Sequence, residues 1–135
     1  METILAPHPD GAPISEALDG GGILPMMFVK VYRYRVRPEM TESYLDLQRR
    51  AARVYGSHMR FTSVHLQSTT DPVAWVEVQW FEDEAAFRKG MELVDADPEV
   101  RGLWNEFKGV LDPRSPEIVE ETYEQALGFA NLKQR

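Results

Sequence analysis

The sequence has no cysteine among its 135 residues. Disulfides, thiolate metal sites and cysteine nucleophiles are therefore excluded. It also has no apolar run near the roughly 18 residues that a membrane-spanning helix requires. A basic segment followed by an apolar core, the mark of a secretory signal, does not occur at its N-terminus. These absences lead us to expect a cytoplasmic protein with no membrane partner.

An excess of basic residues is missing as well. The net charge is −7, with 15 Lys and Arg against 22 Asp and Glu, which argues against nucleic acid as a partner. The bases gather in residues 28–60 and the acids in residues 71–125. Two oppositely charged surfaces favour packing within or between subunits. The alternative is an anionic ligand drawn to the arginine-rich segment.

Motifs that identify a cofactor or a metal are absent too. The 3 histidines show no metal-ligand spacing, and the acids at 82–84 are explained as helix capping. No phosphate-binding loop, dinucleotide fingerprint or nucleophile elbow occurs, and the GGG at 20–22 precedes no helical pattern. We expect neither a metal nor a cofactor.

Composition divides the chain into an arm, a domain and a tail. Residues 1–26 are rich in Pro and Gly and predict an irregular N-terminal arm. Residues 27–126 carry the periodic patterns of one folded domain, and residues 127–135 are left as a C-terminal tail.

The first half of the domain predicts strand, helix, strand. Residues 28–37, FVKVYRYRVR, are rich in β-branched and aromatic residues and indicate a strand. Thr41 predicts the N-cap of a helix that runs to about Tyr55 and stops at Gly56. Residues 59–68 indicate the second strand.

The second half begins with a third strand over residues 73–81. Its alternation places one apolar row on a single face: Ala74, Val76, Val78 and Trp80. Asp83 predicts the cap of a second helix, and Pro98 predicts the first position of a restarted helix. The restarted helix carries an apolar stripe that includes Trp104 and Phe107.

With a final strand over residues 117–125, the predicted order is β-α-β-β-α-β. This is an α+β fold of the ferredoxin-like type, an antiparallel sheet with its helices on one face. The other face then needs a cover, and two subunits joined sheet to sheet provide one. We therefore expect a homodimer through the sheet faces.

Three segments together resemble the antibiotic biosynthesis monooxygenase (ABM) group of the dimeric α/β-barrel superfamily. They are FVKVYRYRVRPEMTESYLDLQRR, VAWVEVQWFEDEAAF and LWNEFKGVL, and the resemblance spans about residues 28–125. It implies a dimeric α/β barrel with a pocket between sheet and helices. A tryptophan near the end of the third strand lines that pocket in ABM-like oxygenases, and Trp80 resembles it; the alternative is that Trp80 only fills the core.

The haem-degrading relatives of this group have an asparagine on the first strand and a histidine on the second helix. Tyr32 stands at the first position here, and no histidine follows His65. The resemblance therefore does not extend to haem chemistry.

The resemblance implies a small cofactor-independent monooxygenase that acts on an aromatic or quinol-like substrate. Such chemistry needs an apolar cavity, a proton acceptor and donors for developing negative charge. We predict His65 and Tyr32 as catalytic candidates, since an unperturbed histidine pKa of about 6.5 suits proton transfer.

The predicted substrate contacts are Trp80, Tyr34, Arg35, Trp104 and Phe107. Each has a simpler alternative: His65 faces solvent or the partner, the tyrosines pack in the pleat, and Arg35 forms a cross-strand or interface ion pair. The alternative function is a non-catalytic dimer that binds a small molecule or serves as a scaffold.

Overall fold

The computed structural model of the protein describes residues 22–23 and 27–131. Most of the predicted arm and the end of the predicted tail lie outside these residues. Within them, Gly22–Ile23 (β1) pairs with Phe129–Ala130 (β6) in a small antiparallel ribbon. This ribbon brings a part of the arm beside a part of the tail.

The main sheet has four strands: Phe28–Arg35 (β2), Thr62–Gln67 (β3), Ala74–Phe81 (β4) and Val119–Glu124 (β5). Their order is β3-β4-β2-β5, and every neighbouring pair is antiparallel. The register places Glu77 of the central strand β4 between Tyr32 of β2 and His65 of β3. The strand bounds lie inside the predicted ranges.

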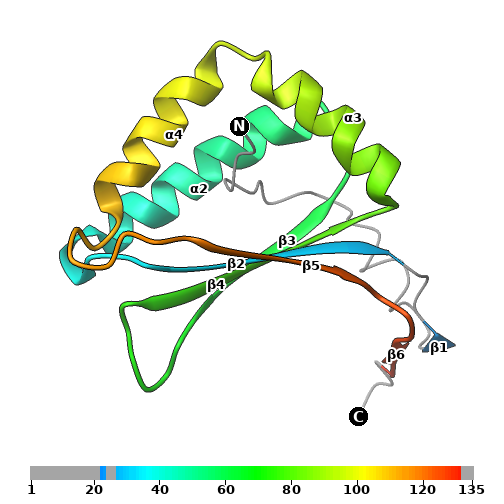
Figure 1. Cartoon of the computed structure of the whole chain (residues 1–135), viewed down its shortest axis with the longest axis horizontal. Coiled ribbons are helices and arrows are strands. Elements are labelled where there is room, and N and C mark those ends of the chain that lie inside the picture. Colours follow the sequence, from blue (N-terminus) through cyan, green and yellow to red (C-terminus); the bar gives the residue numbers. More distant parts are fainter. Residues whose placement is uncertain (1–21, 24–26, 132–135) are drawn as a thin grey trace.

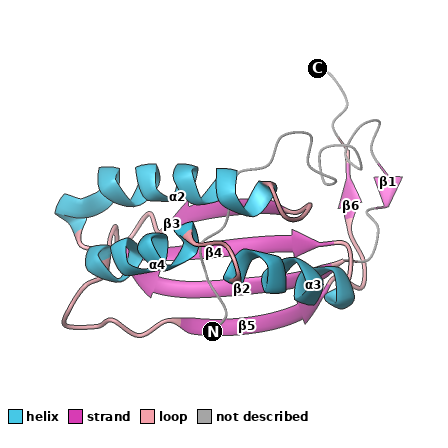
Figure 2. Cartoon of the chain, turned by 90° about the horizontal axis from the view of Figure 1, so that it is seen from above, coloured by secondary structure: helices cyan, strands magenta, loops and turns pink. Residues whose placement is uncertain are grey.

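All the long helices cover one face of this sheet, as Figures 1 and 2 show. They are Thr41–Gly56 (α2), Glu84–Asp95 (α3) and Glu99–Val110 (α4), and a short 3-10 turn, Pro38–Met40 (η1), precedes the first. This arrangement is the α+β, ferredoxin-like fold that the sequence predicts. The second helix of that fold is divided into α3 and α4, because Pro98 has no N–H to continue the helical ladder.

The helix starts test two predicted caps and one predicted first position. Asp83 caps α3 as predicted, accepting a hydrogen bond from Ala86 N at 2.7 Å. The prediction for Thr41 was wrong by one position, because Met40 is the N-cap and the Thr41 hydroxyl donates to Pro38 O at 2.8 Å. Pro98 is likewise the N-cap of α4 and not its first helical residue.

The core fills the space between the sheet and these helices. Burying a large apolar side chain stabilises the folded state by about 1.5–3 kcal/mol, so this layer is the main source of stability. At one point the backbone of α3 comes very close to Met59, which follows α2. A Cβ placed on Gly90 would lie 2.7 Å from the Met59 Cβ, so only glycine fits there without displacement.

No helix in the described part of the chain has both the length and the apolar character needed to cross a membrane.

Candidate functional site

The helix-facing side of β4 carries the polar row of that strand. Trp75, Glu77, Gln79 and Phe81 are buried there, whereas the alternate residues are only partly buried. Trp80 belongs to the second set and lies on the sheet face away from the helices, opposite Val29 and Thr62. The predicted place of Trp80 in a sheet–helix pocket was therefore wrong. The apolar row of β4 faces outward, and Trp75 is the strand's inward indole.

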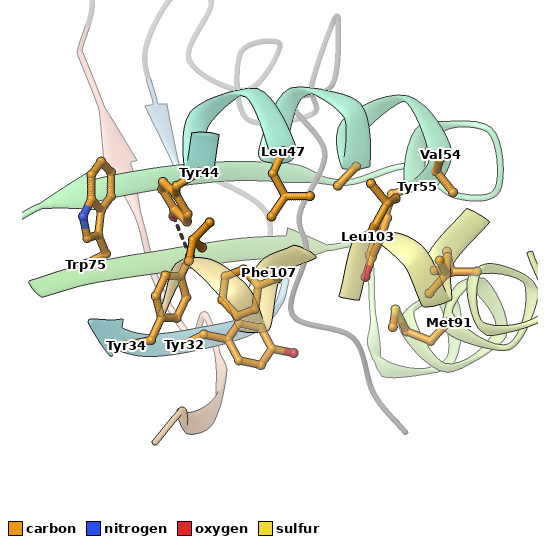
Figure 3. Close-up of a cluster of buried hydrophobic side chains, with 14 of the residues drawn as sticks. Tyr32, Tyr34, Tyr44, Leu47, Val54, Tyr55, Trp75, Met91, Leu103 and Phe107 are labelled. Atoms are coloured by element: carbon orange, nitrogen blue, oxygen red, sulfur yellow. Dashed lines mark hydrogen bonds between the residues drawn. The ribbon is translucent and has the colours of Figure 1, made fainter. Parts of the chain in front are cut away.

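A chain of hydrogen bonds runs through the core from Glu77. The Tyr34 hydroxyl donates to Glu77 Oε1 at 2.8 Å, and the Tyr34 and Tyr44 hydroxyl oxygens are 2.5 Å apart. The Tyr44 hydroxyl lies 3.1 Å from His65 Nδ1. Gln79 Nε2 donates to Glu77 Oε2 at 2.8 Å. Four elements, β4, β2, α2 and β3, thus contribute to one chain of ionisable groups, part of which Figure 3 shows.

Local sequence positions each member of the chain. Period-two alternation aims Tyr34, Glu77 and His65 at the same face of the sheet, in neighbouring strands. Tyr44 projects down from the first turns of α2, on the buried stripe that continues through Leu47. The hydroxyl of Tyr44 therefore meets the sheet where β2, β4 and β3 lie side by side.

The carboxyl of Glu77 is fully buried, at 0% exposure. Burial penalises its charged form and raises its pKa to about 8, although hydrogen bonds from Gln79 and Tyr34 act in the opposite direction. Burial also raises the pKa of Tyr34 and of Tyr44 well above the usual value, and the nearby Glu77 adds to both effects. A carboxyl that titrates near neutral pH in a buried chain is typical of a functional site.

Aromatic rings surround the chain (Figure 3). The Trp75 ring lies 4.7 Å from that of Tyr44, and Phe107 packs edge-on against Tyr34 at 5.0 Å. Trp104 is partly buried and stacks on Phe107 at 5.8 Å. Among the described residues, the buried indole nitrogen of Trp75 has no hydrogen-bond partner. An unpaired buried donor costs about 1–3 kcal/mol, which an acceptor atom of a ligand would recover.

The structure brings four of the predicted site residues close to this chain: His65, Tyr34 and Phe107 directly, and Trp104 through Phe107. Tyr32 is fully buried on the same sheet face, across from Glu77. The Lys30 amine lies 5.9 Å from the centre of the Tyr32 ring and is held by Glu120 and Thr122 of β5. Whether any of these residues takes part in catalysis stays a prediction.

Arg35 is not part of the arrangement. It lies on the opposite side of β2 from Tyr34 and forms an ion pair with Asp71 at 2.9 Å. It lines an open cleft of about 580 Å³ together with Arg37 and Asp112. Arg35 therefore lies apart from the hydrogen-bonded residues and forms an ion pair, as the alternative expected, but with a residue of the β3–β4 loop and not across strands. Its contact with a substrate stays a prediction.

Sequence reasoning missed Tyr44, Trp75, Glu77 and Gln79. It placed the apolar row of β4 toward the helices, which left Glu77 and Gln79 on the opposite face, the one expected to be covered by a partner subunit. One signal was available in the sequence, because Tyr32 and Tyr34 alternate with Arg33 and Arg35 on β2. The inward face of β2 therefore had to be the tyrosine face, and antiparallel pairing then turns one row of β4 toward the same side.

The face away from the helices is largely apolar. It carries Val29, Val31, Val64, Leu66, Val76, Val78, Trp80, Val119 and Tyr123. Several of these are well exposed: Leu66 at 52%, Val119 at 50% and Tyr123 at 49%. None of the described helices lies on this outer face. Exposed apolar residues gathered on one face are typical of interaction surfaces.

No family profile and no curated protein matches the sequence. Comparison with solved structures defines the class: the chain shares the fold of ABM-like and NIPSNAP proteins.

Particular examples come from three bacteria. A NIPSNAP family protein of unknown function from Agrobacterium tumefaciens is 15% identical, with a TM-score of 0.58 over 73% of this chain and 86% of that chain. A candidate antibiotic biosynthesis monooxygenase from Nitrosomonas europaea is 14% identical, with a TM-score of 0.57 over 72% and 88%. A variant of SnoaB, a cofactor-independent oxygenase from Streptomyces nogalater, is 16% identical, with a TM-score of 0.55 over 72% and 90%. At these identities the likeness establishes the fold alone.

Proposed function

We propose that the protein is a cytoplasmic homodimeric monooxygenase that oxidises a small phenolic or quinol-like substrate without a cofactor. The observation that carries this proposal is the buried chain from Glu77 through Tyr34 and Tyr44 to His65. A core gains little stability from such a series of hydrogen bonds, because the desolvation of buried ionisable groups costs free energy that apolar side chains in the same space would not lose. Retaining it inside the layer between sheet and helices favours a chemical role.

The chemistry begins with loss of a proton. His65 takes the proton of the substrate hydroxyl or of an activated carbon, either directly or through the Tyr44 hydroxyl, which passes its own proton on to Nδ1, and this leaves a phenolate or carbanion. This anion gives one electron to O₂, and recombination of the two radicals forms a hydroperoxide on the substrate carbon. Loss of water then leaves a carbonyl. One oxygen atom of O₂ enters the substrate and the other leaves as water, so no external reductant is needed.

Two features support an aromatic substrate. The rings of Trp75, Tyr44 and Phe107 pack together beside the hydrogen-bonded residues, so a substrate admitted between them would meet flat apolar surfaces. The indole N–H of Trp75 offers a donor to a carbonyl or phenolate oxygen. SnoaB, a structural neighbour, is a cofactor-independent oxygenase on the same fold; because fold does not determine function, the neighbour only adds to the observations made on this chain.

A homodimer is part of the proposal, since the exposed apolar residues on the outer face need a cover. A second copy of the same face provides one, with a contact above about 1,000 Å² expected for a specific interface. Sedimentation should give twice the 15.5 kDa chain mass. A monomer at micromolar concentration would contradict this part.

Oxygen consumption with a hydroquinone and with an anthrone tests the activity. We expect uptake above that of heat-denatured protein, and a loss of at least about tenfold in Tyr44→Phe, which keeps the ring and removes the hydroxyl. The matched control is Tyr55→Phe. Tyr55 is on the same helix and is similarly buried, but its ring packs on Phe61 and does not belong to the hydrogen-bonded series from Glu77 to His65. Equal rates in both variants would overturn the proposal.

A second candidate function is a non-catalytic dimeric scaffold. The observation in its favour is that Tyr34, Tyr44 and Phe107 are at most 3% exposed and pack ring against ring. The space beside the chain is thus occupied by side chains. Absence of oxygen uptake, together with no calorimetric binding of either aromatic probe, would favour this second candidate over the oxygenase.

A further inference from the structure

The buried chain is linear, and each hydroxyl in it holds a single hydrogen. Tyr34 bridges Glu77 and Tyr44, and Tyr44 bridges Tyr34 and His65. A hydroxyl between two partners donates to one and accepts from the other. The direction of one hydrogen bond therefore fixes the direction of all the others.

With Glu77 ionised, every hydrogen bond points toward the carboxylate. Tyr34 donates to Glu77, Tyr44 donates to Tyr34, and Nδ1–H of His65 donates to Tyr44. With Glu77 protonated, the order reverses. The carboxyl O–H donates to Tyr34, Tyr34 donates to Tyr44, and Tyr44 donates to an unprotonated Nδ1, so the neutral imidazole carries its hydrogen on Nε2. Gln79 donates to the other carboxylate oxygen in both states.

We infer that Glu77, Tyr34, Tyr44 and His65 form a proton-transfer chain in which the protonation of Glu77 sets the tautomer of His65. A proton that arrives at Nε2 of the imidazole releases the Nδ1 proton to Tyr44. The Tyr44 proton then moves to Tyr34, and the Tyr34 proton moves to Glu77. One proton is gained at Glu77, and His65 returns to neutrality as the other tautomer. Glu77 thus holds the proton that His65 collected, at the other end of a path through the two tyrosine hydroxyls.

Other groups packed around Glu77 do not compete for this role. Tyr32 and Tyr34 face it from β2, His65 from β3 and Tyr44 from α2. Lys30, the nearest cation on this face of β2, is held by Glu120 and Thr122. From α4 the apolar Phe107 packs on the tyrosines. Because the pKa of Glu77 is raised to about 8, both states are reached under mild conditions.

A role of this relay in turnover rests on the proposed function, but the tautomer switch does not. The test is therefore made without substrate, by ¹⁵N–¹H NMR of the full chain with ¹⁵N-labelled histidine. Long-range couplings identify which ring nitrogen carries the hydrogen. Over about pH 7 to 9.5, we expect His65 to change from the Nε2–H to the Nδ1–H tautomer with a midpoint near that of Glu77.

Two variants and one internal control make the test decisive. Glu77→Gln mimics the protonated carboxyl and should hold His65 in the Nε2–H form at every pH. Tyr34→Phe interrupts the chain and should remove the transition from His65. His58, whose Nε2 lies 2.9 Å from Asp97, should behave identically in all samples.

A single unchanging His65 tautomer in the wild-type protein, or the same transition in Tyr34→Phe, would overturn the inference. If the His65 tautomer changes with pH but no oxygen uptake is found, the proton-transfer inference stands and the proposed oxygenase activity is contradicted.

Discussion

The two faces of the main sheet differ in a way that reverses the usual distribution of residues. The face under the helices contains a buried carboxyl, two linked tyrosine hydroxyls and a histidine. The opposite face displays valines, Leu66 and Trp80, several of them well exposed. A monomeric sheet that evolved only for stability would place these groups the other way round. The difference fits the proposed roles, in which the inner face carries the chemistry and the outer face the association.

The comparison predicts the largest stability loss on the inner face. Phe107 is fully buried against Tyr34 and Tyr44, so Phe107→Ala removes contacts and leaves a cavity. We expect a loss of about 3–5 kcal/mol in the free energy of unfolding, measured by urea denaturation. Trp104→Ala on the same helix is the control, and its smaller loss should reflect a ring that is only partly buried. A larger loss at Trp104 would reverse the proposed roles of the two rings.

The next effect concerns the outer face. Leu66→Arg places a charge within the proposed dimer contact, on the edge strand β3, where a buried unpaired charge costs several kcal/mol. We expect the dimer dissociation constant to rise about 100-fold, corresponding to about 2.7 kcal/mol, by sedimentation. Leu93→Arg is the matched control, because Leu93 is 47% exposed against 52% for Leu66 but lies on α3. Equal dissociation in both variants would rule out the sheet face as the interface.

The pH dependence of stability tests the inner face in another way. The pKa of Glu77 is about 8 in the folded chain and about 4.5 when unfolded. Folding therefore takes up a proton between these values, and the contribution of Glu77 to stability is full below about pH 4.5 and falls until about pH 8. Relative to Glu77→Gln, the wild type should lose on the order of 3 kcal/mol from pH 5 to pH 8.

Urea unfolding of both proteins at pH 5 and pH 8 measures this difference. Groups that titrate in the same way in both proteins change both free energies of unfolding equally and so do not contribute to it. Glu39→Gln, at an exposed carboxyl, should follow the wild type. A wild type that gains stability over this interval relative to Glu77→Gln would contradict the buried neutral carboxyl.

The smallest effect separates the two tryptophans of β4. Trp75→Phe keeps an aromatic ring against Tyr44 and removes the indole N–H, so we expect about tenfold weaker binding of a quinol probe by calorimetry. Trp80→Phe, on the outer face, should leave that affinity unchanged within about twofold. If only Trp80→Phe binds the probe more weakly, the ligand site lies on the outer face and not beside Trp75.

The fold was predictable because its determinants are local. Proline and glycine positions, a helix cap at Asp83 and alternating strands were sufficient for the order β-α-β-β-α-β. The site was less predictable, since a strand with period two shows which residues share a face but not which face is inside. On β4 the apolar row was assigned to the helix-facing side. This single choice put Trp80 on the wrong face and left Glu77 unrecognised as a buried residue. Tyr44 lies on the buried stripe of α2, but its hydrogen-bond partners Tyr34 and His65 come from two strands, β2 and β3, that only the tertiary structure brings beside this helix.

The close approach of Gly90 to Met59 has a consequence for how the protein tolerates mutation. Alanine is the residue that helix interiors favour most, so helical glycines are usually the easiest positions to improve. Here the Met59 Cβ occupies the space that any side chain would need. In a library containing every substitution at position 90, selection for folded protein should therefore retain glycine almost alone. At Gly102, where a Cβ would meet nothing within 4 Å, the same library should be enriched in alanine.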